Sequence, residues 1–428
     1  MKNVAAFVLA GGRVADLGVL TLRRAKSALP FAGVYRFVDF PMSNLALSGV
    51  DRVGVLSQYR LSSLMDHIRN GASWGIVGRK REVHVLSPFQ GEGNVDWYRG
   101  TADAVYRNLN FLKGEDRVLI VSGDHVYHMD YNRLLEEHVR TGAHLTMAFK
   151  RFTREACRSF GTADVDSGGR VLSYQEKPAS PRSDLGSLTV YLFERDVLEH
   201  YLRLAMQTGK ESYHLYEDVV PQVVASGKVQ SFLWDGYWAY ARTVDDYFKA
   251  SMDVLDPASG LDLDRWEVFT NADQAGVGDV APAYVTALAG VEDSRLSPGC
   301  LVNGVVRRSI LSPGVVVEEG AQVTECVLMH GVRVGRNCKL HRVIADKHVV
   351  IEDGCQLGHE GAAAPFAGAP QFHTCGAVLL GRESRVAAGA RVGANTQVEP
   401  AAVVAAGSQV DDSSLVKRMG EEPWFARW

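Results

Sequence analysis

The chain has 428 residues, of which 46% are hydrophobic and 22% charged, as expected for a globular protein long enough for about two domains. Its formal net charge of -4 gives no electrostatic reason to bind nucleic acid or a membrane surface. No apolar stretch reaches the ~18 residues that a membrane span requires, and no basic-then-apolar segment opens the sequence. Six scattered cysteines without a C-x-x-C pair indicate neither a zinc site nor a disulfide framework, so we expect a cytoplasmic protein.

The first expected element is a buried strand over residues 4–9 that runs into the loop LAGGRVADL (9–17). An apolar run that stops at paired glycines, Gly11 and Gly12, is typical of a parallel strand whose following turn presents backbone N–H groups to an anionic ligand. The same pattern also fits a simple strand-to-helix turn.

Short apolar runs alternate with amphipathic stretches through residues 1–255, which predicts βα units on a mostly parallel, Rossmann-like sheet. A strand over 53–56 followed by a helix near 61–69 places Gln58 at a strand's carboxyl end, where ligands of open α/β sheets bind. Residues 101–103 can cap the next helix.

A buried strand over residues 117–122 delivers Asp124 at its end. A carboxylate in that position suits magnesium, which takes one or two carboxylates and leaves its other sites to water and substrate. The alternative is that Asp124 caps a turn.

Eight motifs occur in a specific order: LAGG (9–12), RRAK (23–26), RFVDFPMSN (36–44), SQY (57–59), WYRGTADAV (97–105), SGDHVYHMDY (122–131), FG (160–161) and QEKP (175–178). Together they resemble the motifs of bacterial ADP-glucose pyrophosphorylases, the glucose-1-phosphate adenylyltransferases of glycogen synthesis. The resemblance implies a reaction in which glucose 1-phosphate attacks the α-phosphorus of ATP and releases pyrophosphate. Positioning and charge neutralisation supply most of the catalysis in such transfers.

The resemblance also implies roles for individual residues. Gly11 and Gly12 would lie under the nucleotide phosphates, Lys26 would neutralise them, and Asp124 would be the first metal carboxylate. The residues implied for the adenine and ribose pocket are Gln58, Gly100, Thr101 and Asp103. Those implied for glucose 1-phosphate are Glu176 and Lys177, with Tyr98 and Ser187 as further candidates. Without this context, Glu176 and Lys177 would read as an exposed ion pair.

Three positions depart from the family pattern. The loop continues with Val14, Ala15 and Asp16 where the family has glycine, threonine and arginine, so an acid faces the β- and γ-phosphates. Tyr240 stands at the second metal carboxylate, and a neutral phenol is a poor magnesium ligand. Glu217 stands where the family has a sugar-side lysine.

These departures favour a non-catalytic partner subunit, which would hold nucleotide, sugar phosphate and Mg²⁺ weakly or not at all and regulate an active homologue. Three further segments also resemble that partner subunit more closely than the catalytic one: SGDHVYHMDYN (122–132), NLNFL (108–112) and GRKREVHVLSP (78–88). The alternative is an enzyme active on its own. A guanylyl- or uridylyltransferase is disfavoured by WYRGTADAV.

A linker is expected over residues 256–295, because DPASG (256–260) breaks the preceding helix and the following stretch is acidic. Beyond it, three apolar columns recur every 17 residues, as in Ile310, Val327 and Ile344, and Leu380 and five valines then recur every six residues over 380–410. This periodicity predicts a left-handed parallel β-helix over 296–415, with Gly389, Ala394 and Gly407 at tight corners. An irregular insert interrupts it at 359–377, and an aromatic tail occupies 416–428.

The β-helix suggests assembly, since an exposed end coil commonly stacks on a copy or a related chain. The resemblance implies a tetramer with a catalytic paralogue, and a sugar-phosphate effector near Arg23 and Arg24. Left-handed β-helices also occur in acyltransferases, so histidines serving as general base are a remote alternative; they lie at 330, 341, 348, 359 and 373.

Overall fold

Strand β1 (Val4–Leu9) is central to a nine-stranded mixed sheet in the computed structural model, which describes residues 1–12, 16–88, 97–275, 277–278 and 280–418. Its side chains alternate between two hydrophobic cores: Phe7 packs in one, and Ala6 and Val8 pack in the other. Burial of both faces explains why this strand reads as a continuous apolar run.

The sheet has the order β10-β9-β11-β6-β1-β4-β5, with β8 beside β11 and β12 beside β8. Its remaining strands are β4 (Arg52–Leu56), β5 (Glu82–Leu86), β6 (Arg117–Ser122), β8 (Leu145–Arg151), β9 (Thr162–Val165), β10 (Val171–Gln175), β11 (Leu185–Glu194) and β12 (Val229–Leu233). Strands β6, β1, β4 and β5 are parallel, whereas β11 runs antiparallel to β6. The predicted α/β domain is confirmed as a mixed sheet with a parallel half.

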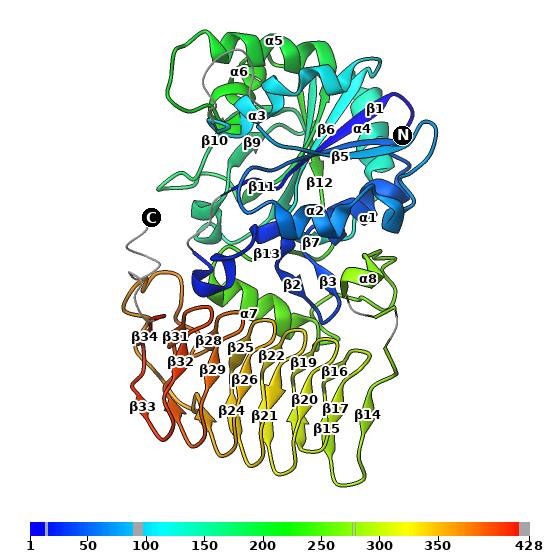
Figure 1. Ribbon diagram of the computed structural model, residues 1–428. Coiled ribbons are helices and arrows are strands. Elements are labelled where there is room, and N and C mark those ends of the chain that lie inside the picture. Colours follow the sequence, from blue (N-terminus) through cyan, green and yellow to red (C-terminus); the bar gives the residue numbers. More distant parts are fainter. Residues whose placement is uncertain (13–15, 89–96, 276, 279, 419–428) are drawn as a thin grey trace.

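Helices cover this sheet, and two small ribbons lie below it, towards the second body (Figure 1). The helices are α1 (Asp39–Leu47), α2 (Ser62–Ile68), α3 (Thr101–Arg107), α4 (Tyr131–Thr141), α5 (Arg195–Met206), α6 (Val220–Ala225), α7 (Val244–Asp253) and α8 (Ala272–Ala275). The ribbons are β2 (Pro30–Phe31) with β3 (Tyr35–Arg36), and β7 (His125–Tyr127) with β13 (Trp238–Tyr240). None of the helices in the described ranges is long and apolar enough to span a membrane.

The second body is the predicted left-handed parallel β-helix, made of three seven-stranded sheets (Figure 1). The first sheet contains β14 (Tyr284–Val285), β17 (Leu301–Val302), β20 (Val316–Val317), β23 (Arg333–Val334), β26 (Val350–Ile351), β29 (Arg385–Val386) and β32 (Val403–Val404). The second contains β15 (Gly290–Glu292), β18 (Val305–Arg307), β21 (Gln322–Thr324), β24 (Lys339–His341), β27 (Gln356–Leu357), β30 (Arg391–Val392) and β33 (Gln409–Val410). The third contains β16 (Arg295–Leu296), β19 (Ile310–Leu311), β22 (Val327–Leu328), β25 (Val343–Ala345), β28 (Val378–Leu380), β31 (Gln397–Val398) and β34 (Leu415–Val416).

The first coil begins at Tyr284, inside the segment expected to be linker. This coil could not be recognised from the sequence, because the early coils do not keep the 17-residue period. Arg295 pairs with Ile310 and Leu296 with Leu311, which is a step of 15 residues. The true connection is therefore shorter, and Trp266 anchors it by packing edge-on against Phe40.

Tight corners of the coils carry residues in the left-handed backbone region. Gly389 and Gly407 do so as predicted, with φ of 70° and 63°. At the third predicted corner the left-handed residue is Asn395 (φ 52°) rather than Ala394. Asn395 suits this conformation because its amide accepts a hydrogen bond from the Gly376 N–H and donates to the Ala364 carbonyl.

The two bodies share a hydrophobic core of their own, in which α7 and the 3₁₀ helix η1 (Gly18–Thr21) pack against the outer face of the third β-helix sheet. Ile310, Val327 and Ile344, one of the predicted 17-residue columns, face this core. The β-helix thus packs against the segment 17–20, which leads away from the loop after β1. Residues 419–428 of the predicted aromatic tail lie outside the described residues.

Candidate active site

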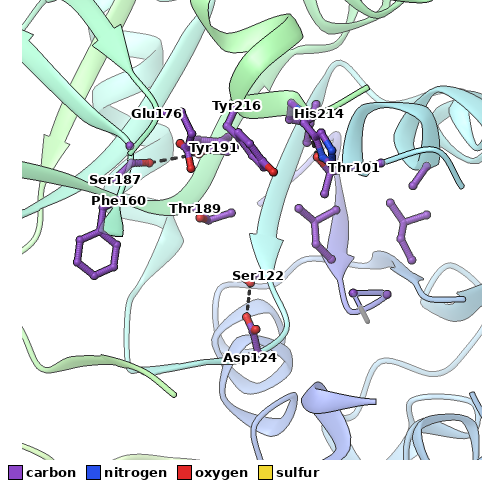
Figure 2. A pocket seen from close by; sticks show the side chains of 18 of the residues that line it. Thr101, Ser122, Asp124, Phe160, Glu176, Ser187, Thr189, Tyr191, His214 and Tyr216 are labelled. Atoms are coloured by element: carbon purple, nitrogen blue, oxygen red, sulfur yellow. Dashed lines mark hydrogen bonds between the residues drawn. The ribbon is translucent and has the colours of Figure 1, made fainter. Parts of the chain in front are cut away.

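A cleft of about 700 Å³ opens where β1, β4 and β6 end. Gly11 and Gly12 after β1, Gln58 after β4, and Asp124 after β6 all line it. Figure 2 shows Ser122 and Asp124 on one side of the cavity and Glu176, Tyr191 and Tyr216 on the opposite side. The carboxyl edge of the parallel strands therefore gathers residues that are far apart in the sequence, as this sheet topology predicts.

Gly11 is closely packed at the base of the cleft. A Cβ atom at this position would lie 3.2 Å from the Cα of Ser57 and 3.3 Å from the backbone N of Gln58. The Ser57 hydroxyl also donates a hydrogen bond to the Ala10 carbonyl. The glycine loop is thus held tightly against the β4 connection. The departures at Val14 and Ala15 lie outside the described residues.

Gln58 holds the opposite wall through reciprocal hydrogen bonds with Tyr98. Its amide accepts from the Tyr98 N–H at 2.6 Å and donates to the Tyr98 carbonyl at 3.3 Å. The Tyr98 hydroxyl is itself bonded to Asn108, 3.0 Å away. Gln58 and Tyr98 both line the cleft, and their mutual bonds fix the shape of this wall.

Gly100 and Thr101 form the start of α3 at the same wall. Gly100 has φ 117°, and a Cβ there would lie 2.2 Å from the carbonyl oxygen of Tyr213, so no other residue fits without a backbone shift. The Thr101 hydroxyl accepts a hydrogen bond from the Leu215 N–H at 3.0 Å. These contacts join the segments 97–101 and 213–215 into one surface.

Asp103, implied as a residue of the adenine and ribose pocket, does not line the cleft. It is 1% exposed, accepts from the Arg99 N–H at 2.8 Å and pairs with the Arg107 guanidinium at 3.0 Å. Its carboxylate is occupied in tying the 97–100 segment to α3, so its role is structural.

The sugar side of the cleft is rich in hydroxyl and aromatic groups. Glu176 accepts a hydrogen bond from the Tyr174 hydroxyl at 2.8 Å, and Ser187 lies 3.2 Å from the Tyr191 hydroxyl. Lys177, which is half exposed, sits 3.5 Å from the Glu176 carboxylate. The predicted residues Glu176, Lys177 and Ser187 therefore come together.

Several lining residues were missed by the sequence reasoning. Thr189 and Tyr191 lie on β11 beside the predicted Ser187, and the period-2 alternation of a strand would have included them. Phe160, His214, Tyr216 and Trp238 also line the cleft. These carry no spacing signal, because the segments that supply them are far apart in the sequence and meet only in the folded chain.

Lys26 forms an ion pair with Asp124, which lines the cleft after β6, and Lys26 Nζ lies 2.8 Å from Asp124 Oδ2. The ring of Tyr240 lies 3.9 Å from the same ammonium. Burial disfavours ionisation of Asp124, but Lys26, His125 and Ser122 together outweigh it and lower the pKa of Asp124 to about 2. Burial raises the pKa of Tyr240 despite the nearby Lys26, so the phenol stays neutral.

The other two departures are Asp16 and Glu217. Asp16 is 3.9 Å from the Arg242 guanidinium, and burial raises its pKa although Arg242 and Lys26 oppose the shift. Glu217 is exposed and does not line the cleft; its neighbour Tyr216 does. The predicted sign change on the sugar side is therefore not directed into the cavity.

Arg24, implied as an effector residue, is committed to the domain interface. It is 3% exposed, and its guanidinium donates two hydrogen bonds to Asp346, at 2.6 and 2.8 Å. This geometry leaves Arg24 a structural role. Arg23 is partly exposed and pairs with Glu383 of the β-helix at 3.2 Å.

Comparison with known proteins assigns the chain. A family model described as Nucleotidyl transferase matches residues 5–257, and one described as GlmU-like, C-terminal hexapeptide matches residues 285–366. A glucose-1-phosphate adenylyltransferase of Bacillus thuringiensis (strain Al Hakam) is 37% identical over 359 residues, covering 82% of this chain and 94% of the relative. Enzymes of the same name from Bacillus mycoides (strain KBAB4) and Bacillus cereus (strain ATCC 10987 / NRS 248) are 36% identical over the same span.

The chain belongs to the glucose-1-phosphate adenylyltransferase family.

The side chains around Asp124 form the set of donors that a divalent ion would meet in this cleft. Among the residues that the structure describes, no cluster of three or more His, Cys, Asp or Glu side chains is arranged to hold a metal. Asp124 is already bound to Lys26 and hydrogen-bonded to Ser122, and Tyr240 offers a neutral phenol. This donor set does not fit Mg²⁺ well.

Proposed function

We propose that the chain is a catalytically impaired glucose-1-phosphate adenylyltransferase that regulates an active homologue. The observation that carries the proposal is the triad of Lys26, Asp124 and Tyr240, in which the ammonium expected to neutralise phosphate lies 2.8 Å from the carboxylate expected to hold the metal. Mg²⁺ would have to displace Lys26 from Asp124 and would gain no second carboxylate, so we infer that it binds weakly or not at all.

Charge at the glycine loop supports the same proposal. An acid at Asp16 in place of arginine replaces attraction to the nucleotide phosphates with repulsion, and one like-charge contact at about 4 Å costs on the order of 4 kcal/mol at an effective dielectric of 20. Since about 1.4 kcal/mol corresponds to a factor of ten in rate, losses of roughly a thousandfold follow.

The alternative is an enzyme that is active by itself, and one observation favours it. Arg242 lies 3.9 Å from Asp16, on the segment that carries Tyr240, and could supply the missing guanidinium. It does not line the cleft in the described structure, so we rank this function second.

Acyl transfer is a remote third reading. His373 is fully buried and burial lowers its pKa to about 4, and His359 is paired with Asp412. Turnover of acetyl-CoA would support this reading.

For assembly, we propose that the first β-helix coil contacts a second family member, as in a tetramer with a catalytic paralogue. Strands β14, β15 and β16 each have a neighbour on one side only, and apolar side chains stand exposed around them. The exposed residues are Val280, Tyr284, Val285, Leu288 and Val291. An open strand edge beside an apolar patch is typical of an interface. We also propose that the assembly acts in the cytoplasm, where thiols stay reduced.

For regulation, we propose that a sugar phosphate binds near Arg23 at the domain interface. Arg24, Arg36 and Arg382 lie close to Lys347 there, and the facing acids are Asp346 and Glu383. Burial is the main cause that lowers the pKa of Lys347 to about 7, and repulsion from the three arginines lowers it further. An anion would relieve that repulsion.

The experiment that tests the proposal mixes the purified chain with a catalytic paralogue and measures pyrophosphate release as a sugar bisphosphate is titrated. We expect the chain to change the paralogue's maximal rate or half-saturating effector concentration while adding no turnover of its own. If the paralogue's response is identical with and without the chain, the regulatory role is wrong.

A further inference from the structure

Gln397 is a buried polar residue in a row that is apolar at all its other positions from Ile310 onward. After Arg295 in the first coil, the outward positions of the third β-helix sheet, in ladder order, are Ile310, Val327, Ile344, Leu379, Gln397 and Leu415. Gln397 is 1% exposed. An amide buried among apolar side chains is costly unless all its groups are bonded, so its partners define its role.

The partners of Gln397 form a chain of hydrogen bonds with one possible polarity. His373 Nε2 lies 2.7 Å from the Ala377 carbonyl, which can only accept, so Nε2 carries the proton. The imidazole is neutral, because burial lowers its pKa to about 4, and Nδ1 is therefore an acceptor. Gln397 Nε2 donates to it at 3.1 Å, which leaves Oε1 to accept from the Val19 N–H at 3.2 Å.

The receiving segment is η1, directly after the glycine loop. Gly18 has φ 53°, and a Cβ there would lie 2.3 Å from Gln397 Oε1, so this backbone approaches the amide as closely as only glycine allows. Val19 lies three residues after Asp16. The β-helix thus fixes the downstream end of the loop on which the nucleotide phosphates would lie.

The insert 359–377, which supplies His373, also contacts the segment that follows Tyr240. Asp245 accepts hydrogen bonds from the backbone N–H groups of Thr374 and Cys375, at 2.7 and 3.0 Å. The Val244 N–H donates to the Phe372 carbonyl at 3.0 Å. These residues begin α7, four residues after Tyr240, so the insert contacts the Tyr240 segment directly and the Asp16 segment through Gln397.

We propose that the insert 359–377 and Gln397 form a clamp that positions the glycine loop and the Tyr240 strand relative to each other, with Gln397 and His373 as positioning residues of the cleft. The inference rests on the proposed function only in taking this cavity as the nucleotide cleft. Through this clamp the β-helix contacts both segments: Gln397 bonds to Val19, and the insert bonds to Val244 and Asp245.

Hydrogen exchange of the full-length chain tests the clamp without any ligand. Gln397→Met keeps the size but removes both hydrogen bonds, and Gln409→Met is the matched control, because Gln409 begins strand β33 as Gln397 begins β31 but is exposed. We expect amide exchange in residues 16–22 to rise about tenfold in Gln397→Met, with faster exchange also in 9–12, and to stay unchanged in the control.

His373→Phe is expected to accelerate exchange in both 16–22 and 240–246, and His373→Gln, which again offers a donor and an acceptor, to restore most of the protection. Unchanged exchange in 16–22 for Gln397→Met would overturn the clamp. So would acceleration throughout the third β-helix sheet together with a lower melting temperature, since that pattern marks a merely structural role. Because exchange needs no turnover, these results are independent of whether the chain is catalytically impaired.

Discussion

Asp16, four residues after Gly12, and Arg242, two residues after Tyr240, face each other, with Arg242 Nε 3.9 Å from Asp16 Oδ2. In the family pattern these two positions carry arginine and glycine, so the cation and the small residue have been replaced by a facing acid and base. The Asp16 carboxylate offsets the charge of Arg242, the one cation of the pair that could otherwise neutralise a bound phosphate.

Restoring the family chemistry should restore turnover. We expect Asp16→Arg with Tyr240→Asp to raise the rate of pyrophosphate release at least tenfold, because it returns a cation to the loop and a second carboxylate to the metal end. Adding Arg242→Gly should raise it further, since the introduced guanidinium would otherwise face Arg242. Asp16→Asn with Tyr240→Phe is the control. Equal rates in the restored and control variants would mean that the remaining pocket cannot support the reaction.

Breaking the buried ion pair between Arg24 and Asp346 at the domain interface should strongly destabilise the chain. Arg24→Met leaves Asp346 charged and without its partner in a site that is 2% exposed, so we expect a loss of about 3–5 kcal/mol in unfolding free energy. The neighbouring Arg23→Met breaks an exposed pair and should cost about 0–1 kcal/mol. Denaturant melts of both variants give the comparison, and similar losses would show that Arg24 does not anchor the domains.

Gly100 should tolerate no side chain. We expect Gly100→Ala to destabilise the chain by roughly 2 kcal/mol or more, because it combines a left-handed backbone with a contact to the Tyr213 carbonyl. Gly114 has φ 89° but open space around it, so Gly114→Ala should cost only about 1 kcal/mol. Thermal unfolding measures both, and an equal cost would attribute the effect to φ alone.

Anion binding at the interface should weaken as pH rises. Lys347 has a pKa of about 7, so it is protonated at pH 6 and mostly neutral at pH 8, and an anion prefers the protonated form. We expect sulfate, which does not titrate in this range, to bind up to about tenfold more weakly at pH 8 than at pH 6. Lys347→Arg keeps the charge and should remove the pH dependence. The same slope in both proteins would place the titrating group elsewhere.

Local patterns in the sequence were enough to predict the sheet edge and the solenoid. The apolar run of β1 ends at Gly11, and Ile310, Val327 and Ile344 repeat at the spacing of one coil, so both signals are contained in short windows. The first coil, which begins at Tyr284, was not predicted, because the number of residues per coil varies.

Long-range contacts could not be predicted in the same way. Asp103 did have a local signal, since Arg99 and Arg107 stand four residues before and after it, but nothing near Arg24 indicates Asp346, which is 322 positions away. The partner of a buried charge is decided by tertiary packing. For the same reason, the contacts of Gln397 with Val19 appear only in the folded chain.

The most direct test of the central claim is the steady-state rate of ADP-glucose formation by the purified full-length chain alone, at saturating ATP, glucose 1-phosphate and Mg²⁺. The charge arrangement of Lys26, Asp124 and Asp16 predicts a rate roughly a thousandfold or more below that of the Bacillus thuringiensis relative under the same conditions. A rate within tenfold of that enzyme would contradict the account.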